Sequence, residues 1–349
     1  MSLWTKRYTI PAVFTTCSYA RSIVFEGKIW TLCEIQNEGN DESYQTRLFV
    51  FDPVSEVLTE INCVYPAAGI SKLHRFVANK TDLYMWKAPD GVSERDHHLY
   101  KFNRATLEWD WILKLRRRGY WKSVVIIEQV MHVLETIKWI DEVSLITIDL
   151  TNKEVVSIQR LESFGEWRFL STHNNNLYLM DCHNDCRKMS EVKNGELIEI
   201  AQEKLDRRDY EGQDMAHVYC ADSNECVAYA CRNRKFKALQ FDFASLTWDM
   251  ELKTPDPPVM YDIGQINSVV KMDRSLYILL KICKNGKTRF ELQKLEIYPK
   301  LVSICLADLA SRLSEESDEQ KEEYLKHLPI QIRNELTELM EWKKDAENY

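Results

Sequence analysis

Glycine is scarce in this sequence, with ten in 349 residues, and none forms a loop of the kind that cradles a phosphate group. The sequence also lacks a Gly-x-Ser-x-Gly nucleophile turn and a His-Glu-x-x-His zinc helix. Carboxylates are plentiful, but no spacing singles out an acid–base pair. We therefore expect a protein that is not an enzyme and that needs no cofactor.

A metal-ligand pattern is missing as well. The one cluster that resembles a ligand set is Cys182-His183-x-x-Cys186, which differs from the Cys-x-x-Cys pairs of zinc ribbons. No second pair with matching spacing lies near it in the sequence. The sequence therefore predicts no metal site.

Long apolar runs are absent, so no segment is predicted to span a membrane, and the first residues lack the apolar core of a signal peptide. The net charge of −8 provides no general attraction to nucleic acid or to an anionic membrane. The ten cysteines are scattered rather than arranged as a disulfide framework. We expect reduced thiols and a location in the cytoplasm, the nucleus or both.

The clearest signal that is present is a repeated strand hairpin. Leu99–Ile112 is typical of a strand, a polar turn and a second strand with Trp109 and Trp111. A close relative of it recurs at Leu239–Leu252, and fainter ones occur at Leu48–Ile61 and Leu145–Ile158. A hairpin that returns along the chain indicates a repeated sheet architecture.

The repeat period follows from a second landmark, a pair of residues that are mostly apolar or aromatic. Each pair opens a predicted strand, and a short apolar run precedes it. Its second members recur about every 50 residues, which is the period of a propeller of the kelch kind. They are Trp30, Tyr84, His132, Tyr178, Ala228 and Tyr277. The sequence predicts an all-β, six-bladed kelch-like β-propeller over residues 1–298, with a small α-helical appendage over residues 299–349. The apolar runs that precede the pairs would be the innermost strands.

The last blade lacks its outer strand, because Pro299 follows the third strand and a helical pattern begins. An open blade would expose a sheet edge that can pair with other chains. The spare strand is Leu3–Ile10 at the N-terminus. We predict that it completes blade 6 and so closes the ring.

The propeller part resembles kelch-repeat proteins. The matching order is an aromatic residue, Asp or Asn, Thr or Ser, and Trp. It occurs as Tyr100, Asn103, Thr106 and Trp109, and again as Phe241, Asp242, Ser245 and Trp248. The diglycine that usually ends the second strand of a kelch repeat is absent throughout. A WD40 propeller is the alternative, but no Gly-His pair accompanies the Trp-Asp pairs.

The apolar period changes to three or four residues after Pro299, which predicts helices. One helix would carry Leu301, Cys305, Leu309 and Leu313 on a single face. Ser314–Glu323 is interpreted as a solvated acidic linker, and a second helix is predicted over Ile330–Lys344.

This tail resembles a BC-box followed by a cullin-box, the SOCS-box-like module of elongin–cullin ubiquitin ligases. The resemblance implies that Leu301, Cys305 and Leu309 bind elongin C of elongin B/C, and that Leu328, Pro329 and Ile330 contact a cullin. Lys300 stands where Ser, Thr or Pro is usual, and Gln331 replaces the usual second proline. The absence of that second proline favours cullin-2 as the cullin. An F-box starting at Leu328 would leave too few residues for its helices.

A candidate binding site follows from the first residues of the predicted inner strands. Four are cationic and one is a histidine, and tryptophans flank two of them. They are Arg21, Arg75, Lys122, Arg168 and His217, with Gln265 at the sixth position and Trp121 and Trp167 beside them. At equivalent positions they would ring the channel mouth and hold an acidic peptide or a free C-terminus. The alternative is that these residues merely begin exposed strands.

Two further groups have ordinary interpretations. Arg116-Arg117-Arg118 could extend the cationic surface or could be a solvated loop, and His97-His98 is interpreted as the polar end of a hairpin. Taken together, the sequence predicts the substrate-recognition subunit of a cullin-RING ubiquitin ligase. The alternative is a non-enzymatic kelch-like scaffold or protein-interaction module whose tail packs on its own propeller.

Overall fold

The fold is taken from a computed structural model of the chain. Within some of its strands only the backbone is described. In the propeller region the structure describes residues 3–9, 17–36, 44–65, 75–87, 96–117, 119–137, 142–161, 167–183, 186–204, 214–218, 225–232, 235–243, 245–252, 263–272, 275–284 and 287–296. In the C-terminal region it describes residues 309, 310, 312, 313, 317–326, 328, 332–334, 336, 337 and 340.

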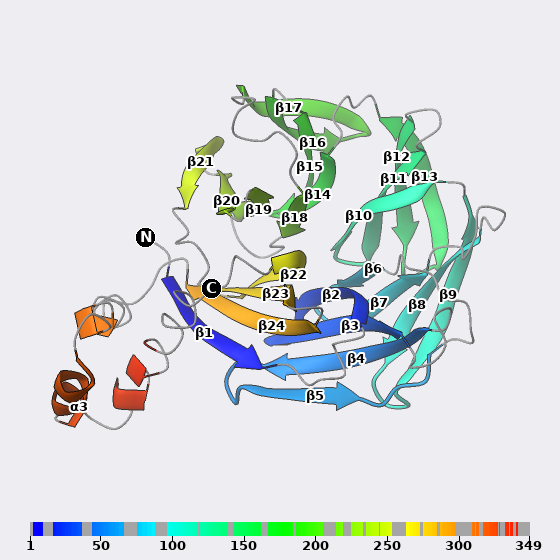
Figure 1. The fold of residues 1–349 in the computed structure, drawn as a ribbon. Coiled ribbons are helices and arrows are strands. Elements are labelled where there is room, and N and C mark those ends of the chain that lie inside the picture. The colour runs from blue at the N-terminus through cyan, green and yellow to red at the C-terminus, as the bar shows by residue number, and fades with distance from the viewer. Residues whose placement is uncertain are drawn as a thin grey trace.

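The strands form six four-stranded antiparallel sheets arranged in a ring, which is a β-propeller (Figure 1). Blade 1 contains β2 (Cys17–Phe25), β3 (Lys28–Gln36), β4 (Tyr44–Asp52) and β5 (Val57–Ile61). Blade 2 contains β6 (Arg75–Ala78), β7 (Leu83–Lys87), β8 (Asp96–Asn103) and β9 (Glu108–Arg116). Blade 3 contains β10 (Tyr120–Ile127), β11 (Val130–Ile137), β12 (Glu142–Asp149) and β13 (Glu154–Leu161).

The second half of the ring repeats this order. Blade 4 contains β14 (Trp167–His173), β15 (Asn176–His183), β16 (Cys186–Lys193) and β17 (Glu196–Lys204). Blade 5 contains β18 (Asp214–Val218), β19 (Glu225–Arg232), β20 (Lys235–Asp242) and β21 (Thr247–Leu252). Blade 6 contains β22 (Ile263–Met272), β23 (Ser275–Lys284), β24 (Lys287–Glu296) and β1 (Leu3–Thr9).

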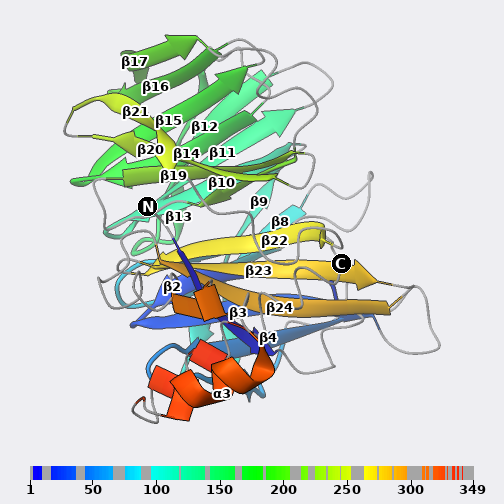
Figure 2. The same ribbon diagram turned by 60° about the vertical axis from the view of Figure 1, so that its left-hand side comes forward.

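The first strand of each blade lies innermost. β2 contacts β6 and β22, β10 contacts β6 and β14, and β18 contacts β22. In blade 5 this innermost strand is β18, which ends at Val218. The turned view in Figure 2 shows the strands of blade 6 running beside those of blade 1.

The apolar core lies between the blades. In strand β3 Ile29 packs toward blade 6 and Trp30 toward blade 2, so both faces of the strand are buried. This explains why the second strand of blade 2, Leu83–Lys87, has an almost unbroken apolar sequence. The outer strands β9 and β13 have mixed buried and exposed positions instead, because one of their faces meets solvent.

Strand β1 closes the ring, as the missing outer strand of blade 6 predicts. It pairs antiparallel with β24, and Tyr8 lies opposite Leu292. Tyr8 also reaches blade 1, where its ring lies 4.7 Å from that of Phe51 and its hydroxyl donates to Glu56 Oε1 at 3.4 Å. The N-terminal strand therefore completes the sheet of blade 6 and also contacts blade 1 through Tyr8.

The hairpins between third and fourth strands share one turn design in three blades. The side chains of Asp52, Asn103 and Asp149 each accept hydrogen bonds from the backbone N–H groups two and three residues later. The fourth residue after each has a positive φ: Glu56, Leu107 and Lys153. The recurring Asp or Asn of the sequence hairpins is therefore the residue that shapes the turn.

The C-terminal region contains α3 (Asp318–Lys326), which begins inside the segment interpreted as a solvated linker. That interpretation is wrong because Ser317 and Gln320 form a capping box. The backbone N–H of Ser317 donates to Gln320 Oε1 at 3.1 Å, and the backbone N–H of Gln320 donates to Ser317 Oγ at 3.4 Å. Among the described residues, no helix is long and apolar enough to cross a membrane.

The helical residues of the tail share a small apolar core. Ala310 and Leu336 are buried in it, and partly buried residues pack against them: Leu309, Leu325, Leu328, Ile332 and Met340. The described members of this cluster belong to the tail. Figure 1 shows α3 outside the ring, on the side that carries β1.

Removing residues 1–10 is expected to unfold the propeller or make it aggregate, because β24 becomes an unpaired edge and blade 1 loses Tyr8. A finer test compares Tyr8→Ala with Tyr8→Phe in denaturant unfolding. The alanine variant should lose about 2 kcal/mol of unfolding free energy, and the phenylalanine variant clearly less, because it retains the ring packing. A truncated protein that stays monomeric and unfolds cooperatively at the wild-type midpoint would contradict closure by β1.

Candidate functional site

The predicted cationic ring can be tested by strand register. Each inner strand has one residue opposite the landmark of its second strand, such as Val77 opposite Tyr84. Arg21 and Arg75 both lie two residues before that position in their strands. These two residues therefore occupy equivalent places in neighbouring blades.

The other ring positions are not equivalent in register, so the predicted equivalence is wrong for them, whereas ligand binding at these residues stays a prediction. Lys122 and Arg168 lie three residues before the reference position, and Lys122 falls within a bulge of β10. His217 is itself opposite its landmark, and Gln265 lies five residues before Val270 in a strand with two register shifts. A bulge in β10 and two register shifts in β22 displace Lys122 and Gln265 without changing the sequence period, whereas β14 and β18 pair with their neighbours without a shift.

Among the ring residues, only Arg21 has a described side chain, and it is half-buried. Several predicted site residues are described by backbone alone, and their side chains lie outside the described part. These are Arg75, Trp121, Lys122, Trp167, Arg168 and His217. Whether they bind a ligand remains a prediction.

The basic run before blade 3 is partly used inside the protein. Arg117 donates through Nε to Glu135 Oε2 at 2.8 Å, and its Nη2 bonds to the same oxygen. Glu135 is fully buried, and the backbone N–H of Gly119 donates to its Oε1 at 3.2 Å. Arg117 therefore compensates a buried carboxylate, which corrects its interpretation as a possible part of the cationic surface.

His97 is buried rather than placed at a polar hairpin end. Its ring stacks on Trp86 at 5.5 Å, and Trp86 Nε1 donates to His97 Nδ1 at 3.1 Å. Burial lowers the pKa of His97 to about 4. Burial has the same effect on His132, whose pKa is also lowered to about 4. Both imidazoles are therefore neutral at pH 7.

A groove of about 660 Å³ lies between blades 2 and 3. It lies at the end of the blades where the first strand turns into the second and the third into the fourth. Its buried lining includes Tyr84, Ile112 and Leu150. One wall is strand β9 with Asp110 and Trp111, and the other consists of blade 3 turns with Gln129, Thr151 and Lys153. No local sequence pattern predicts this groove, because its walls come from segments about 40 residues apart.

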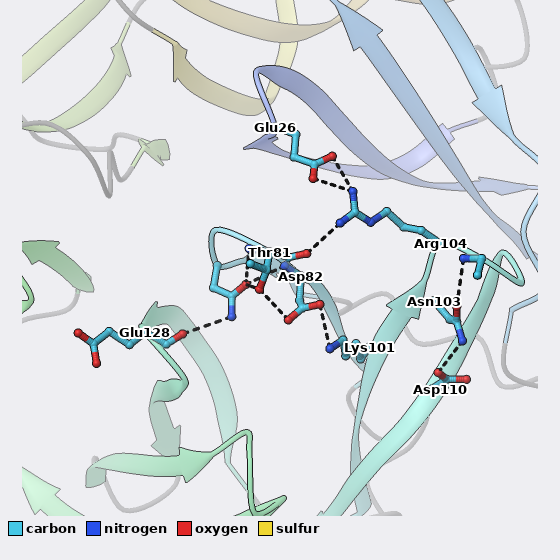
Figure 3. A network of polar contacts seen from close by, with 10 residues as sticks. Glu26, Thr81, Asp82, Lys101, Asn103, Arg104, Asp110 and Glu128 are labelled. Carbon is cyan, nitrogen blue, oxygen red and sulfur yellow. Dashed lines mark hydrogen bonds and ion pairs between the residues drawn. The ribbon is translucent and has the colours of Figure 1, made fainter.

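A polar network fixes the turns beside the groove (Figure 3). Arg104 Nη1 contacts both Glu26 oxygens of blade 1, at 2.6 and 2.7 Å, and Nη2 donates to the Thr81 carbonyl at 3.2 Å. Asn79 Nδ2 donates to the Glu128 carbonyl of blade 3 at 3.3 Å. These contacts bridge blades 1, 2 and 3 and hold the two walls in place.

Within the groove, one pair of charges is already matched. Lys101 Nζ lies 2.8 Å from Asp82 Oδ1. Burial disfavours the ionised form of Asp82, but the hydrogen bonds from Lys101 and Thr81 outweigh it, so the pKa of Asp82 lies below its usual value. Burial also raises the pKa of Tyr84 to about 12, so its phenol stays neutral.

Other groove groups have few partners within the described part of the chain. Asp110 accepts only an amide hydrogen bond, from Asn103 Nδ2 at 3.1 Å. Lys153 is exposed and has no carboxylate partner among the described residues. Trp111 is 57% exposed, although tryptophan is usually well covered. The groove thus presents a carboxylate and an ammonium group to solvent.

The predicted partner-binding residues of the tail are described only in part. Leu309 and Leu328 lie in the tail core, whereas Leu301, Cys305, Pro329 and Ile330 lie outside the described residues. The side chains of Cys182, His183 and Cys186 also lie outside them. Among described side chains, no group of three His, Cys, Asp or Glu residues is placed to hold a metal ion.

Comparisons with known proteins add little beyond the fold. No protein-family model matches the chain, and no curated protein matches it in sequence. One similar solved structure is the β-propeller domain of the Trilobed protease from Pyrococcus furiosus, which is described as having an open velcro topology. The match covers 81% of this chain and 84% of that chain, with 12% sequence identity and a TM-score of 0.43.

The lowered pKa values of His97 and His132 predict a specific pH dependence of stability. Their folded-state pKa lies below the unfolded value of 6.5, so their contribution is present above pH 6.5 and is lost as the pH falls toward 4. The loss is at most about 3 kcal/mol per histidine. The His97→Asn/His132→Asn variant should show a flatter unfolding free energy between pH 6.5 and 4.

The carboxylates provide an internal control for this measurement. Hydrogen bonds from the Val54 backbone N–H and from Lys28 lower the pKa of Asp52, so its contribution is lost below the ordinary aspartate range. The wild type and the His97→Asn/His132→Asn variant should therefore lose unfolding free energy to the same extent below about pH 4. An unchanged slope between pH 6.5 and 4 in the double variant would contradict the role of the histidines.

Proposed function

We propose that this chain is the substrate-recognition subunit of a cullin-RING ubiquitin ligase, built on a diverged kelch propeller. The propeller holds a target protein, the segment from Leu301 recruits elongin B/C, and the segment from Leu328 contacts a cullin, with cullin-2 favoured. Such a subunit performs no chemistry of its own. It raises the effective concentration of the target beside the ubiquitin-conjugating enzyme.

The observation that supports this proposal is the core of the tail. Ala310 and Leu336 are buried among residues of the tail, including Leu309 and Leu328. A helical unit with an apolar core of its own is suited to present a helix to a groove on a partner. The alternative is a non-enzymatic kelch-like scaffold or protein-interaction module whose tail packs on its own propeller.

Affinity capture from cells tests the tail. The full-length protein should retain elongin B and C, and the Leu301→Ser/Cys305→Phe variant should lose at least nine-tenths of both. Tyr324→Ala is a matched control, because Tyr324 is an exposed residue of α3. The variants should unfold at the wild-type temperature, which separates a lost contact from a lost fold. Absence of elongin from the wild-type capture would refute the proposal.

The target would bind at the channel mouth, with Arg21 and Arg75 as the first candidates because their register positions are equivalent. Lys122, Arg168, His217, Trp121 and Trp167 are retained as candidates that differ in register. Arg75→Ala or Arg168→Ala should weaken binding of acidic or C-terminal peptide baits about tenfold. Unchanged binding of every such bait would remove this site while leaving elongin recruitment untouched.

A further inference from the structure

We propose that the outer part of blade 2, on the side turned toward blade 1, is a docking surface for an extended acidic segment of a protein partner. A large apolar residue of that segment would cover Trp111. This proposal goes beyond the ligase assignment and does not rest on it. The surface consists of Tyr100, Trp111, Lys114 and Arg116, and we call it the rim surface because β9 is the outermost strand of its blade.

Strand register places these side chains on one face of the sheet. Trp111 lies opposite Tyr100 in the pairing of β8 with β9, and Lys114 lies opposite His98. Residues two apart in a strand share a face, and the rings of His98 and Tyr100 stack with their centroids 6.3 Å apart. Tyr100 packs against the core that blades 1 and 2 share, so this face is turned toward blade 1. Trp111 therefore belongs to the strand that borders the groove, but its side chain lies on the other face of the sheet.

Exposure changes abruptly between two tryptophans of this face. Trp109 and Trp111 are two residues apart in β9, yet Trp109 is 7% exposed and Trp111 is 57% exposed. Blade 1 has an outer strand of five residues, β5, whereas β9 has nine. After Ile61 the chain leaves β5 and reaches the start of β9, where the Val64 N–H donates to the Leu107 carbonyl at 3.0 Å. The indole of Trp111 lies farther along β9 than that contact and is open to solvent.

An exposed indole beside a half-buried tyrosine suits an apolar side chain of a partner. Large and rigid aromatic residues dominate the binding energy of many protein interfaces. Pairing with β8 fixes the backbone of Trp111, and the core of blades 1 and 2 holds Tyr100 in place. Little ordering of the protein is therefore needed on binding, which favours a short extended segment.

The charges at the far end of β9 define what accompanies the apolar residue. Arg116 lies opposite Asp96, and Lys114 Nζ lies 2.6 Å from Asp96 Oδ2. Among the described side chains that β8 and β9 carry on this face, one carboxylate thus meets two cations. This end of the rim surface is positive in a chain whose net charge is −8. A partner carboxylate would balance it, and the planar guanidinium of Arg116 can hold a carboxylate through two hydrogen bonds.

The strand geometry sets the spacing between the two contacts. Their register partners, Tyr100 and Asp96, are four residues apart in β8. At the rise of a strand this corresponds to about 13 Å. An extended peptide has the same rise, so we expect its acidic residue three to five positions from its apolar residue.

Fluorescence polarisation with the full-length protein tests the proposal. The probes are labelled eleven-residue peptides with a central leucine or tryptophan in a Gly-Ser background. A single glutamate stands two, three, four or five residues from the centre, on either side. Matched peptides carry glutamine in place of the glutamate, or serine in place of the central residue.

At least one peptide with its glutamate three to five residues from the centre should bind, and Trp111→Ala should weaken that binding at least tenfold. Arg116→Gln should weaken binding of the same peptide about threefold and leave binding of its glutamine version unchanged. Both variants should keep the wild-type unfolding midpoint, because both side chains are exposed. A loss of binding then reports a lost contact.

Two control variants should bind the peptide like the wild type. Asp110→Asn tests the face, because Asp110 precedes Trp111 in β9 but lies opposite Lys101 on the groove side. Ile158→Ala tests exposure alone, because Ile158 is an exposed apolar residue of another outer strand, β13.

Four results would overturn the proposal. The first is that no peptide distinguishes the wild type from Trp111→Ala. The second is that the glutamine peptides bind as tightly as the glutamate peptides. The third is that Asp110→Asn weakens binding as much as Arg116→Gln, which would place the ligand on the other face. The fourth is a dimer in sedimentation that Trp111→Ala abolishes, which would assign the rim surface to a second copy of the chain.

Discussion

A ring of sheets has to be closed by one contact between the two ends of its chain. Here that contact is the pairing of β1 with β24, which brings Tyr8 opposite Leu292. The entropy lost in closing so long a loop grows only slowly with its length, so one strand of backbone hydrogen bonds and side-chain packing can outweigh it. Without β1, the edge of β24 is exposed and the core between blades 6 and 1 loses Tyr8. The packing of all the other blades presupposes this closure, because each blade is held between two neighbours.

Closure also determines where the molecule can bind other molecules. Inner strands bury both faces between blades, so their side chains serve mainly for packing. The outer strands and the turns retain exposed groups. Trp111 remains exposed at such a place, beside turns whose geometry is set by Asn103 and Asp149. A rigid ring can therefore display different side chains at its two ends without changing its core.

Local patterns predicted the strands well, because an apolar run between polar turns forms a strand in every blade. The hairpin at Leu99–Ile112 became β8 and β9, with Asn103 shaping the turn. The prediction of equivalent cations failed for a physical reason. Bulges near Lys122 and Gln265 displace the register, and a period counted along the sequence does not detect them.

The helix α3 was missed although Ser317 and Gln320 carried its signal, because the acidic residues around them are also typical of a solvated loop.

The sequence by itself determined the all-β architecture, the order of strands in each blade and the completion of blade 6 by the N-terminal strand. These properties depend on local alternation, turn chemistry and one missing strand, all of which can be read along the chain. The tertiary structure alone decided which polar residues are buried and which remain available. It placed Glu135 against Arg117, buried His97 beneath Trp86, and set Asp110 and Lys153 on two walls of one groove. Contacts of this kind join separate strands or neighbouring blades, and their distances depend on packing that no local pattern encodes.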